Sequence, residues 1–335
     1  MRPDLFDADD DPVIGHRFRR VTNVLRRTNE PVQMAEELLL AEEEPLSFAD
    51  AEPHECWRRQ GRLLVGVYVD DLVVTGGDAK AILGFKTEMM GRFRLSDLGL
   101  LSFYLGIEVK QKAEEIILTQ AAYAGELLAR AGMAHCNPVH VPMEPHLKLS
   151  KEGLEPRVDA TDYRSIVGGL RYLTHTRPDI TYAVGYVSRF MEAPTMAHLA
   201  AVKHLLRYIA GTRKLGCRYV KGQDGELIGY SDSDMAGDID DRKSTSGNLF
   251  FLGGAPITWQ SQKQKIVALS SCEAEYVAAT TAACQAIWLS RLMRDLLKED
   301  AGATTIFIDS KSAIQLCKNS LSLSLSLSLS LSLNR

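Results

Sequence analysis

The feature that most constrains the fold of this sequence is the order of apolar segments after residue 226. Three short stretches, LIGYSD, NLFFLGG and PITWQ, predict strands, and a long helical pattern and a fourth strand, TTIFID, follow them. Ser270 with Glu273 three residues later is a capping-box pattern that predicts the start of the long helix. Strands that lead into a helix, another strand and a short helix predict a self-contained α/β unit.

Three acidic residues lie where these predicted elements begin or end. Asp232 ends the first strand, Glu275 lies in the first turn of the long helix, and Asp309 ends the fourth strand. Carboxylates that converge from three elements suit Mg²⁺, and a pair of ions about 4 Å apart can activate water for phosphodiester cleavage. Each residue also has a structural explanation, because Asp forms turns and Glu in a first turn complements the helix dipole. The acidic loop after the first strand is expected to be solvated, with Asp234 as a spare candidate.

Residues 66–76, GVYVDDLVVTG, place Asp70 and Asp71 between two β-branched runs. Taken alone, this pattern predicts a hairpin and favours a turn over a metal site at the Asp pair. AKAILGFKTEMMGRF then predicts a helix, and FYLGIEV predicts one strand whose apolar residues share a face. EIILTQ and AAYAGELLARAGM predict a further strand and a short helix.

Beyond a proline-rich linker, three apolar patterns predict helices from Tyr163 to Thr174, from Ile180 to Met191 and from Met196 to Ala210. Thr195 is the predicted N-cap of the third helix and Gly211 its predicted stop. Basic residues in this region have two explanations, a solvated face or contact with phosphate. These residues are Arg171, Arg189, Lys203 and Arg207.

Composition leaves nucleic-acid binding open, because local basic faces can contact phosphate even in a chain with a net charge of −4. The six cysteines include no CxxC pair, which predicts reduced thiols in an intracellular protein. Apolar runs fall short of the roughly 20 residues that a membrane span needs, so no membrane partner is expected. The terminal Leu-Ser alternation is low complexity and is interpreted as an accidental translation product that promotes aggregation.

The strings DRKSTSG, TWQSQKQ, LSSCEAEY and IDSKSAIQLCKN resemble the ribonuclease H domain of Ty1/copia-type retrotransposon polyproteins. The resemblance implies a mixed five-stranded sheet with helices, and it implies that Asp232, Glu275 and Asp309 are three of four metal-binding carboxylates. The fourth is expected beyond Asn319, where the Leu-Ser repeat begins. Weak or absent hydrolysis is therefore expected.

YVDDLVVTG resembles the YxDD box of copia-type reverse transcriptases, and YRSIVGGLRYLTHTRPDITYAVGYVSRFM resembles their thumb and connection region. Asp70 and Asp71 are thereby implied to be two metal-binding aspartates that act with a third Asp from an earlier palm strand. EPLSFADAEPHECWRRQ resembles the lead-in to the polymerase core, and it ends just before the box. An internal deletion, with loss of polymerase activity, is therefore expected.

The resemblances predict an α/β (α+β) chain made of six segments. These are a mostly disordered lead-in (1–60), a palm and thumb remnant (61–137), a linker (138–161), a helical connection (162–222), a truncated ribonuclease H-like domain (223–319) and the Leu-Ser tail (320–335).

The ancestral function implied is RNA-directed DNA synthesis with degradation of the RNA strand of an RNA/DNA hybrid, supported by Mg²⁺ or Mn²⁺. The alternatives are a non-catalytic nucleic-acid-binding remnant and an inert pseudogene product.

Overall fold

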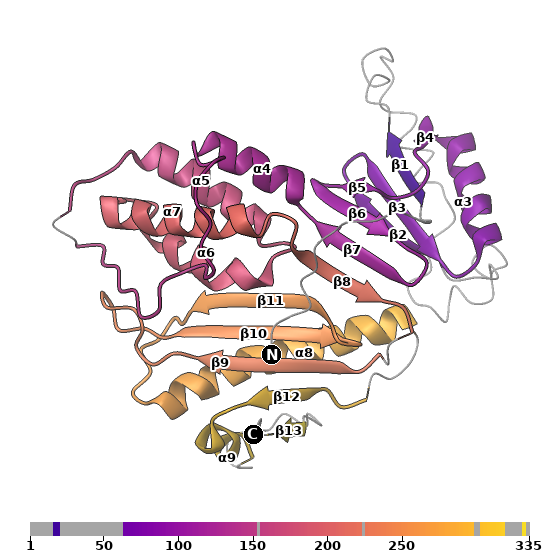
Figure 1. Ribbon diagram of the computed structural model, residues 1–335. Helices are drawn as coiled ribbons and strands as arrows, with labels where there is room; N and C mark the ends of the chain where they lie inside the picture. The colour runs from indigo at the N-terminus through magenta and orange to yellow at the C-terminus, as the bar shows by residue number, and fades with distance from the viewer. Residues whose placement is uncertain are drawn as a thin grey trace, which may run out of the picture. The chain divides into compact units, whose positions relative to one another are not determined.

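The computed structural model describes residues 16–20, 63–152, 155–222, 225–297, 302–318 and 330–332 (Figure 1). Most of the predicted lead-in and of the Leu-Ser tail lies outside these residues. Contacts divide the chain into two compact units. Of the described residues, the smaller unit contains 16–20, 63–104 and 111–113, and the larger contains 105–110 and those from 114 onward.

The smaller unit is built on the predicted hairpin. β2 (Leu63–Tyr68) and β3 (Asp71–Gly76) pair antiparallel, and β1 (His16–Arg20) and β4 (Leu95–Asp97) extend the sheet in the order β2-β3-β1-β4. The predicted helix α3 (Ala79–Arg92) begins after Asp78, whose carboxylate accepts the Lys80 N–H at 2.8 Å. The buried Lys86 of this helix forms an ion pair with Asp97 at 2.7 Å, which ties α3 to β4.

The prediction of one continuous strand in FYLGIEV is wrong. The strand β5 (Phe103–Tyr104) ends at a turn, and β6 (Ile107–Gln111) begins after it. Leu105 and Gly106 both have left-handed backbone torsions, with φ of 49° and 76°. Consecutive positive φ values are typical of tight two-residue turns and are incompatible with an extended strand. A side chain on Gly106 would also lie 2.6 Å from the Tyr172 hydroxyl.

The first layer of the larger unit is helical. It contains α4 (Ala121–Arg130), α5 (Ala160–Leu173), η2 (Pro178–Ile180), α6 (Thr181–Val187), η3 (Ser188–Phe190) and α7 (Met196–Gly211). The three helices predicted in this region are present, although 3₁₀ turns flank the second. The Thr195 N–H donates to His198 Nδ1 at 2.9 Å at the start of α7, and the helix ends at Gly211, both as predicted.

One apolar core joins the helices on both sides of the predicted linker. Leu127 and Leu128 of α4 pack in the same buried cluster as Leu170 of α5 and Leu205 of α7. Near α4, the strand β7 (Glu115–Thr119) pairs antiparallel with β8 (Gly216–Val220). Sequence patterns did not predict β8, because GCRYV is short and shows no alternation of apolar and polar residues.

The second layer is a five-stranded sheet with the order β11-β10-β9-β12-β13. Its strands are β9 (Leu227–Ser233), β10 (Thr245–Leu252), β11 (Ala255–Lys263), β12 (Thr305–Ile308) and β13 (Ser330–Ser332). β9 pairs antiparallel with β10 and parallel with β12, so the sheet is mixed. The four strands predicted from residue 227 onward are confirmed, and the fifth comes from the Leu-Ser tail.

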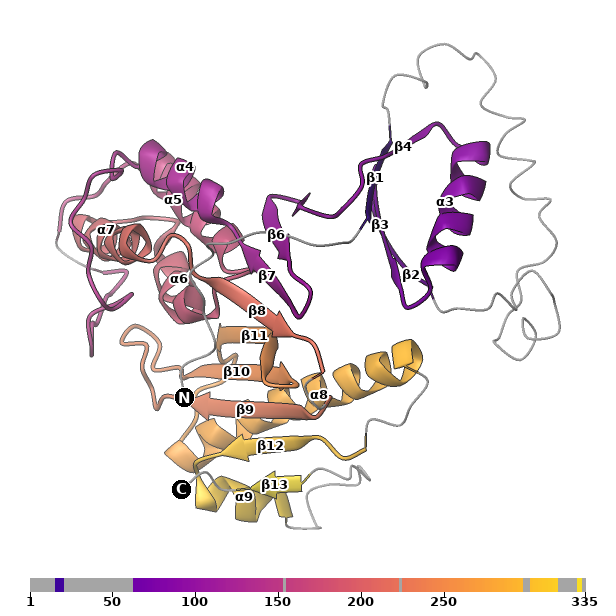
Figure 2. The ribbon, with the colours of Figure 1, turned by 45° about the vertical axis from the view of Figure 1, so that its right-hand side comes forward.

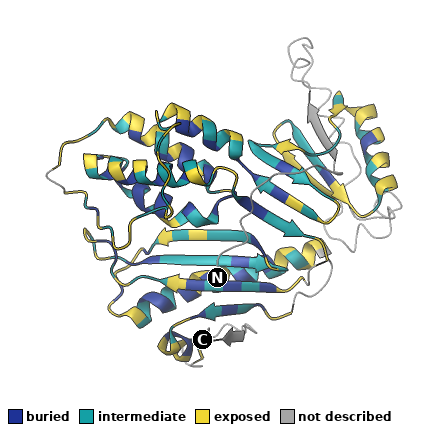
Figure 3. Ribbon diagram, viewed as in Figure 1, coloured by how far each residue is buried: buried dark blue, intermediate teal, exposed yellow. Residues whose placement is uncertain are grey.

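The long helix α8 (Ser271–Leu297) covers one face of this sheet, and the short helix α9 (Lys311–Lys318) follows β12 (Figure 2). Figure 3 shows buried and exposed positions interleaved along α8. Phe250 is fully buried between sheet and helix, and a Cβ on the facing Gly229 would lie 2.5 Å from its ring. No helix among the described residues is long and apolar enough to cross a membrane.

Arg177 ties the 3₁₀ turn η2 to the end of α7. Its side chain is 1% exposed and donates two hydrogen bonds to the Asp179 carboxylate, at 2.9 and 2.7 Å. Nη1 also donates to the Thr212 carbonyl at 2.8 Å, and the Tyr208 hydroxyl donates to Asp179 at 2.9 Å. Every group in this network is therefore paired, which is the condition under which a buried ion pair is tolerated.

Arg177→Met should lower the free energy of unfolding by about 3–5 kcal/mol, because Asp179 keeps its buried charge and loses its partner. Urea unfolding followed by circular dichroism measures this change. Arg294→Met, which removes an exposed arginine from α8, should stay within about 0.5 kcal/mol of the wild type. Equal losses in the two variants would contradict a role for the Arg177 network.

Candidate metal centre

Three carboxylates from three elements meet at one edge of the five-stranded sheet. Asp232, Glu275 and Asp309 each offer an oxygen, and these oxygens lie within 4.8 Å of one another. The strand register explains two of them, because β12 runs parallel to β9 and pairs Ile308 with Ser231. The next residue on each strand is an aspartate, so both side chains emerge at the same edge.

The third carboxylate is delivered by the start of α8. The Ser270 hydroxyl accepts the Glu273 N–H at 3.2 Å, and the Glu273 carboxylate accepts the Leu269 N–H at 2.7 Å, which fixes where the helix begins. Buried alanines then recur every fourth residue on the side that packs against the sheet: Ala274, Ala278, Ala282 and Ala286. These small side chains let α8 lie close to the sheet, so Glu275 reaches the two aspartates.

Gln264 is a positioning residue that sequence reasoning missed. Its buried carboxamide nitrogen lies 3.1 Å from Ser233 Oγ, 3.0 Å from Ser246 Oγ and 2.9 Å from the Ala274 carbonyl. It therefore ties the ends of β9 and β10 to the turn of α8 that carries Glu275. The available signal was a glutamine four residues after the predicted strand PITWQ, which is too common to single out.

Glu275 is the buried member of the group, with 7% of its surface exposed. Its Oε1 accepts the Ser233 N–H at 3.1 Å, and the same N–H donates to Asp232 at 2.8 Å. Oε2 is buried and has no hydrogen-bond donor among the described residues. Burial, and then repulsion from Asp232 and Asp309, raise the pKa of Glu275 to about 7.

An all-oxygen donor set with excess negative charge and one unsatisfied buried oxygen fits a hard divalent cation such as Mg²⁺. An ion at this position would satisfy Glu275 Oε2 and neutralise the repulsion that raises the pKa of its carboxyl. The sequence predicts a metal site at these three residues, and the structure brings their carboxylate oxygens within 4.8 Å of one another.

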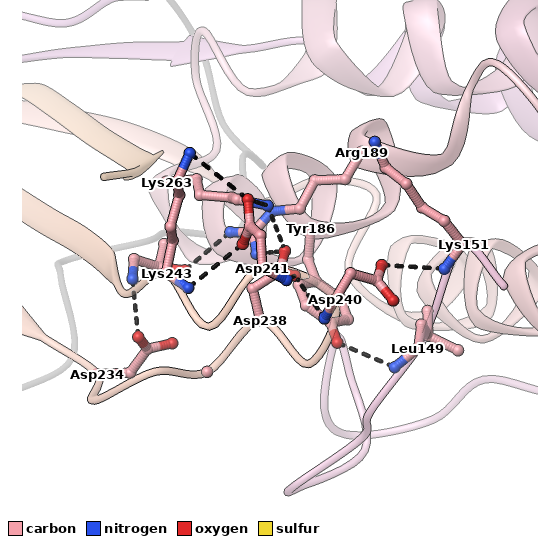
Figure 4. A network of polar contacts seen from close by, with 12 residues as sticks. Leu149, Lys151, Tyr186, Arg189, Asp234, Asp238, Asp240, Asp241, Lys243 and Lys263 are labelled. Atoms are coloured by element: carbon pink, nitrogen blue, oxygen red, sulfur yellow. Dashed lines mark hydrogen bonds and ion pairs between the residues drawn. The ribbon is translucent and has the colours of Figure 1, made fainter. Parts of the chain in front are cut away.

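The prediction of a solvated acidic loop is wrong for Asp238 but holds for Asp240, which is exposed. Asp238 is buried and accepts hydrogen bonds from Lys263 Nζ at 2.7 Å and from Arg189 at 3.3 Å (Figure 4). Burial would raise the pKa of Asp238, but the Lys263 hydrogen bond and backbone N–H donors outweigh it and lower the pKa to about 2. The spare candidate Asp234 is outside the metal group, and its carboxylate accepts the Thr245 N–H at 2.7 Å.

The four basic residues for which the sequence left open a solvated face or phosphate contact have different surroundings. Arg189 is engaged by Asp238 and also donates to Thr245, and Arg207 donates to the Asn137 carbonyl at 2.7 Å. Arg171 and Lys203 are exposed. Arg189 and Arg207 therefore donate hydrogen bonds within the protein, whereas Arg171 and Lys203 face solvent.

Asp70 and Asp71 lie in the smaller unit, at the turn between β2 and β3. Tyr68 pairs with Asp71, so Val69 and Asp70 form the tip. Val69 is 81% exposed and has a φ of 51°, an unusual conformation for a β-branched residue. In the part of the chain that the structure describes, no further acidic side chain joins these two in a group able to hold a metal ion.

The stability of the metal-free protein should fall as pH rises from about 4.5 to about 7. The folded state holds the Glu275 proton up to its raised pKa, whereas an unfolded glutamate releases it near its ordinary value of 4.5, so rising pH favours unfolding. Glu275→Gln should remove this contribution. Urea unfolding at pH 5 and pH 7.5 with a chelator measures it, and Glu192→Gln, an exposed site, should keep the wild-type slope. An equal change in the free energy of unfolding between pH 5 and pH 7.5 in the two variants would contradict the assignment of this pH dependence to Glu275.

Comparisons with known proteins agree with these observations. Residues 50–145 match the family model described as reverse transcriptase (RNA-dependent DNA polymerase). The chain is 42% identical over 253 residues to the retrovirus-related Pol polyprotein from transposon RE1 of Arabidopsis thaliana, covering 76% of this chain and 17% of that protein. It is 41% identical over 268 residues to the Pol polyprotein from transposon TNT 1-94 of Nicotiana tabacum, covering 77% of this chain and 20% of the other.

A shorter relative is covered more completely. The chain is 33% identical over 233 residues to the putative transposon Ty5-1 protein of Saccharomyces cerevisiae, with 66% of this chain and 72% of that protein aligned. The chain thus spans no more than about a fifth of the two plant polyproteins and most of the yeast protein. It belongs to the family of copia-type retrotransposon Pol polyproteins and corresponds to a part that includes reverse transcriptase sequence.

Proposed function

We propose that residues 223–319 are a ribonuclease H-like domain that binds Mg²⁺ through Asp232, Glu275 and Asp309 and acts on the RNA strand of an RNA/DNA hybrid. The observation that carries this proposal is the convergence of three carboxylates within 4.8 Å from three separate elements. The unsatisfied Oε2 of Glu275 supports it further, because such a buried acceptor is costly without a cation or a donor.

Asp232, Glu275 and Asp309 would hold the metal, which would supply water activation and charge stabilisation for phosphodiester cleavage. The protein supplies a rigid frame, since Gln264 and the shared Ser233 N–H hold two of the carboxylates in place. Three carboxylates give a good set of ligands for one ion and an incomplete set for two. We therefore propose that one metal ion binds tightly and that hydrolysis of the RNA strand is slow.

For the polymerase-related segment, we propose that Asp70 and Asp71 descend from a reverse transcriptase metal site and no longer polymerise DNA. The strained Val69 at the hairpin tip supports a functional origin, because such backbone strain is concentrated at active sites. In the proposed organisation, residues 61–137 are a palm and thumb remnant that precedes a linker (138–161) and a helical connection (162–222).

A second candidate function is nucleic-acid binding without catalysis. It is favoured by the exposed side chains of Arg171 and Lys203, which have no ion-pair partner among the described residues. Binding of this kind weakens steeply with salt, because each phosphate contact releases counterions. An inert product would show neither binding nor cleavage.

The full chain should cleave an end-labelled RNA/DNA hybrid slowly and only with Mg²⁺ or Mn²⁺. Asp232→Asn should reduce the rate at least about 100-fold, because even outer-shell partners of metal ligands contribute about 10- to 100-fold. Asp295→Asn, which removes an exposed carboxylate from α8, should cleave like the wild type. Cleavage that survives Asp232→Asn would disprove the assigned site, and rapid cleavage by the wild type would disprove the proposed slow hydrolysis.

A further inference from the structure

Two neighbouring hollows lie on the larger unit, and Asp232 of the carboxylate cluster lines the first of them. The first has a volume of about 420 Å³ and includes Asp232, Gly247 and Tyr182 in its lining. The second has a volume of about 720 Å³ and includes Arg171 and His175. Both are lined by Thr181 and Ser261, so the two hollows adjoin, and we call the pair the exit groove.

The floor of the exit groove follows a straight line across the sheet. Asp232 on β9 pairs with Gly247 on β10, and Gly247 pairs with Ser261 on β11. A Cβ on Gly247 would find no atom closer than 3.9 Å, so the space above this glycine is open. The line then reaches α6, where a Cβ on Gly185 would lie 3.4 Å from the Ser261 carbonyl. The open space therefore lies above Gly247, whereas α6 packs closely on β11 at Gly185.

Charge changes sign along the exit groove. The near end is lined by the carboxylates of Asp232 and Asp234, and the far end carries Arg171 beside the exposed His175. Two other arginines of the same helical layer are neutralised inside the protein, Arg177 by Asp179 and Arg189 by Asp238. Among the described residues, Arg171 forms no ion pair. It is therefore available to an anionic ligand.

An aromatic side chain lines the first hollow. Tyr182 is 48% exposed and stacks on Tyr186, with ring centroids 6.0 Å apart. An exposed ring that is held by a neighbour offers a surface on which a nucleobase can stack. A cation, an open backbone track and an aromatic platform together match the chemistry of a single nucleic-acid strand, which carries regularly spaced phosphates and bases.

We propose that the exit groove takes one strand of the nucleic acid beyond the metal site, with a phosphate on Arg171 and a base on Tyr182. This inference rests on the proposed function, since its near end is the metal centre. It assigns the helical layer α5 and α6 a direct part in holding the substrate. Arg171 and Tyr182 are thereby substrate-positioning residues.

The test is binding of a fluorescent RNA/DNA hybrid and of a single-stranded DNA oligonucleotide to the full chain, measured by anisotropy over a range of salt concentrations. A chelator prevents cleavage. Arg171→Gln should weaken binding about 5- to 10-fold. It should also reduce the salt slope, which is the slope of log affinity against log salt concentration, by about one. Tyr182→Leu should weaken binding at least about 5-fold with an unchanged salt slope. Arg294→Gln, which removes an exposed arginine on α8, should bind like the wild type.

Wild-type affinity in either the Arg171 or the Tyr182 variant would overturn the exit groove as a strand track. Cleavage by Asp232→Asn, measured separately, decides the metal site. Loss of cleavage in that variant with normal binding by Arg171→Gln would disprove only the groove. Weakened binding by Arg171→Gln with no effect of Asp232→Asn would disprove only the metal centre.

Discussion

The repulsion among three carboxylates at the edge of the mixed sheet is the constraint on which the rest of the larger unit depends. Burial of Glu275, and then its proximity to Asp232 and Asp309, raise the pKa of its carboxyl, so holding the three groups together costs free energy. The surrounding fold compensates by other means. The parallel pairing of β9 with β12, the capped start of α8 and the hydrogen bonds of Gln264 hold the carboxylates close, although no cationic side chain among the described residues forms an ion pair with them.

Elsewhere in this unit, charged groups are neutralised where they are buried. Arg177 is matched by Asp179, and Asp238 is matched by Lys263 and Arg189. The contrast identifies the carboxylate cluster as the place where negative charge is left uncompensated. Such an arrangement is expected where a cation or a substrate supplies the missing partner. In the proposed groove, the exposed Arg171 is the matching positive charge, to which an anionic phosphate would bind.

The sequence predicted the parts of this structure that depend on local patterns. The strand ends at Asp232 and Asp309 and the capping box at Ser270 were readable because alternation and caps are short-range signals. FYLGIEV failed because alternation alone does not show that two consecutive residues adopt positive φ. Gln264, the Asp238 network and the shared core of α4, α5 and α7 were not predictable, because each depends on contacts between residues far apart in the chain.

The most direct measurement of the central claim is calorimetric titration of Mg²⁺ into the full chain at pH 7.5, with Asp309→Asn and Asp295→Asn titrated alongside. A metal centre at the sheet edge predicts saturable binding in the wild type and in Asp295→Asn, with at least about 10-fold weaker binding in Asp309→Asn. Binding that is absent from the wild type, or unchanged in Asp309→Asn, would contradict it.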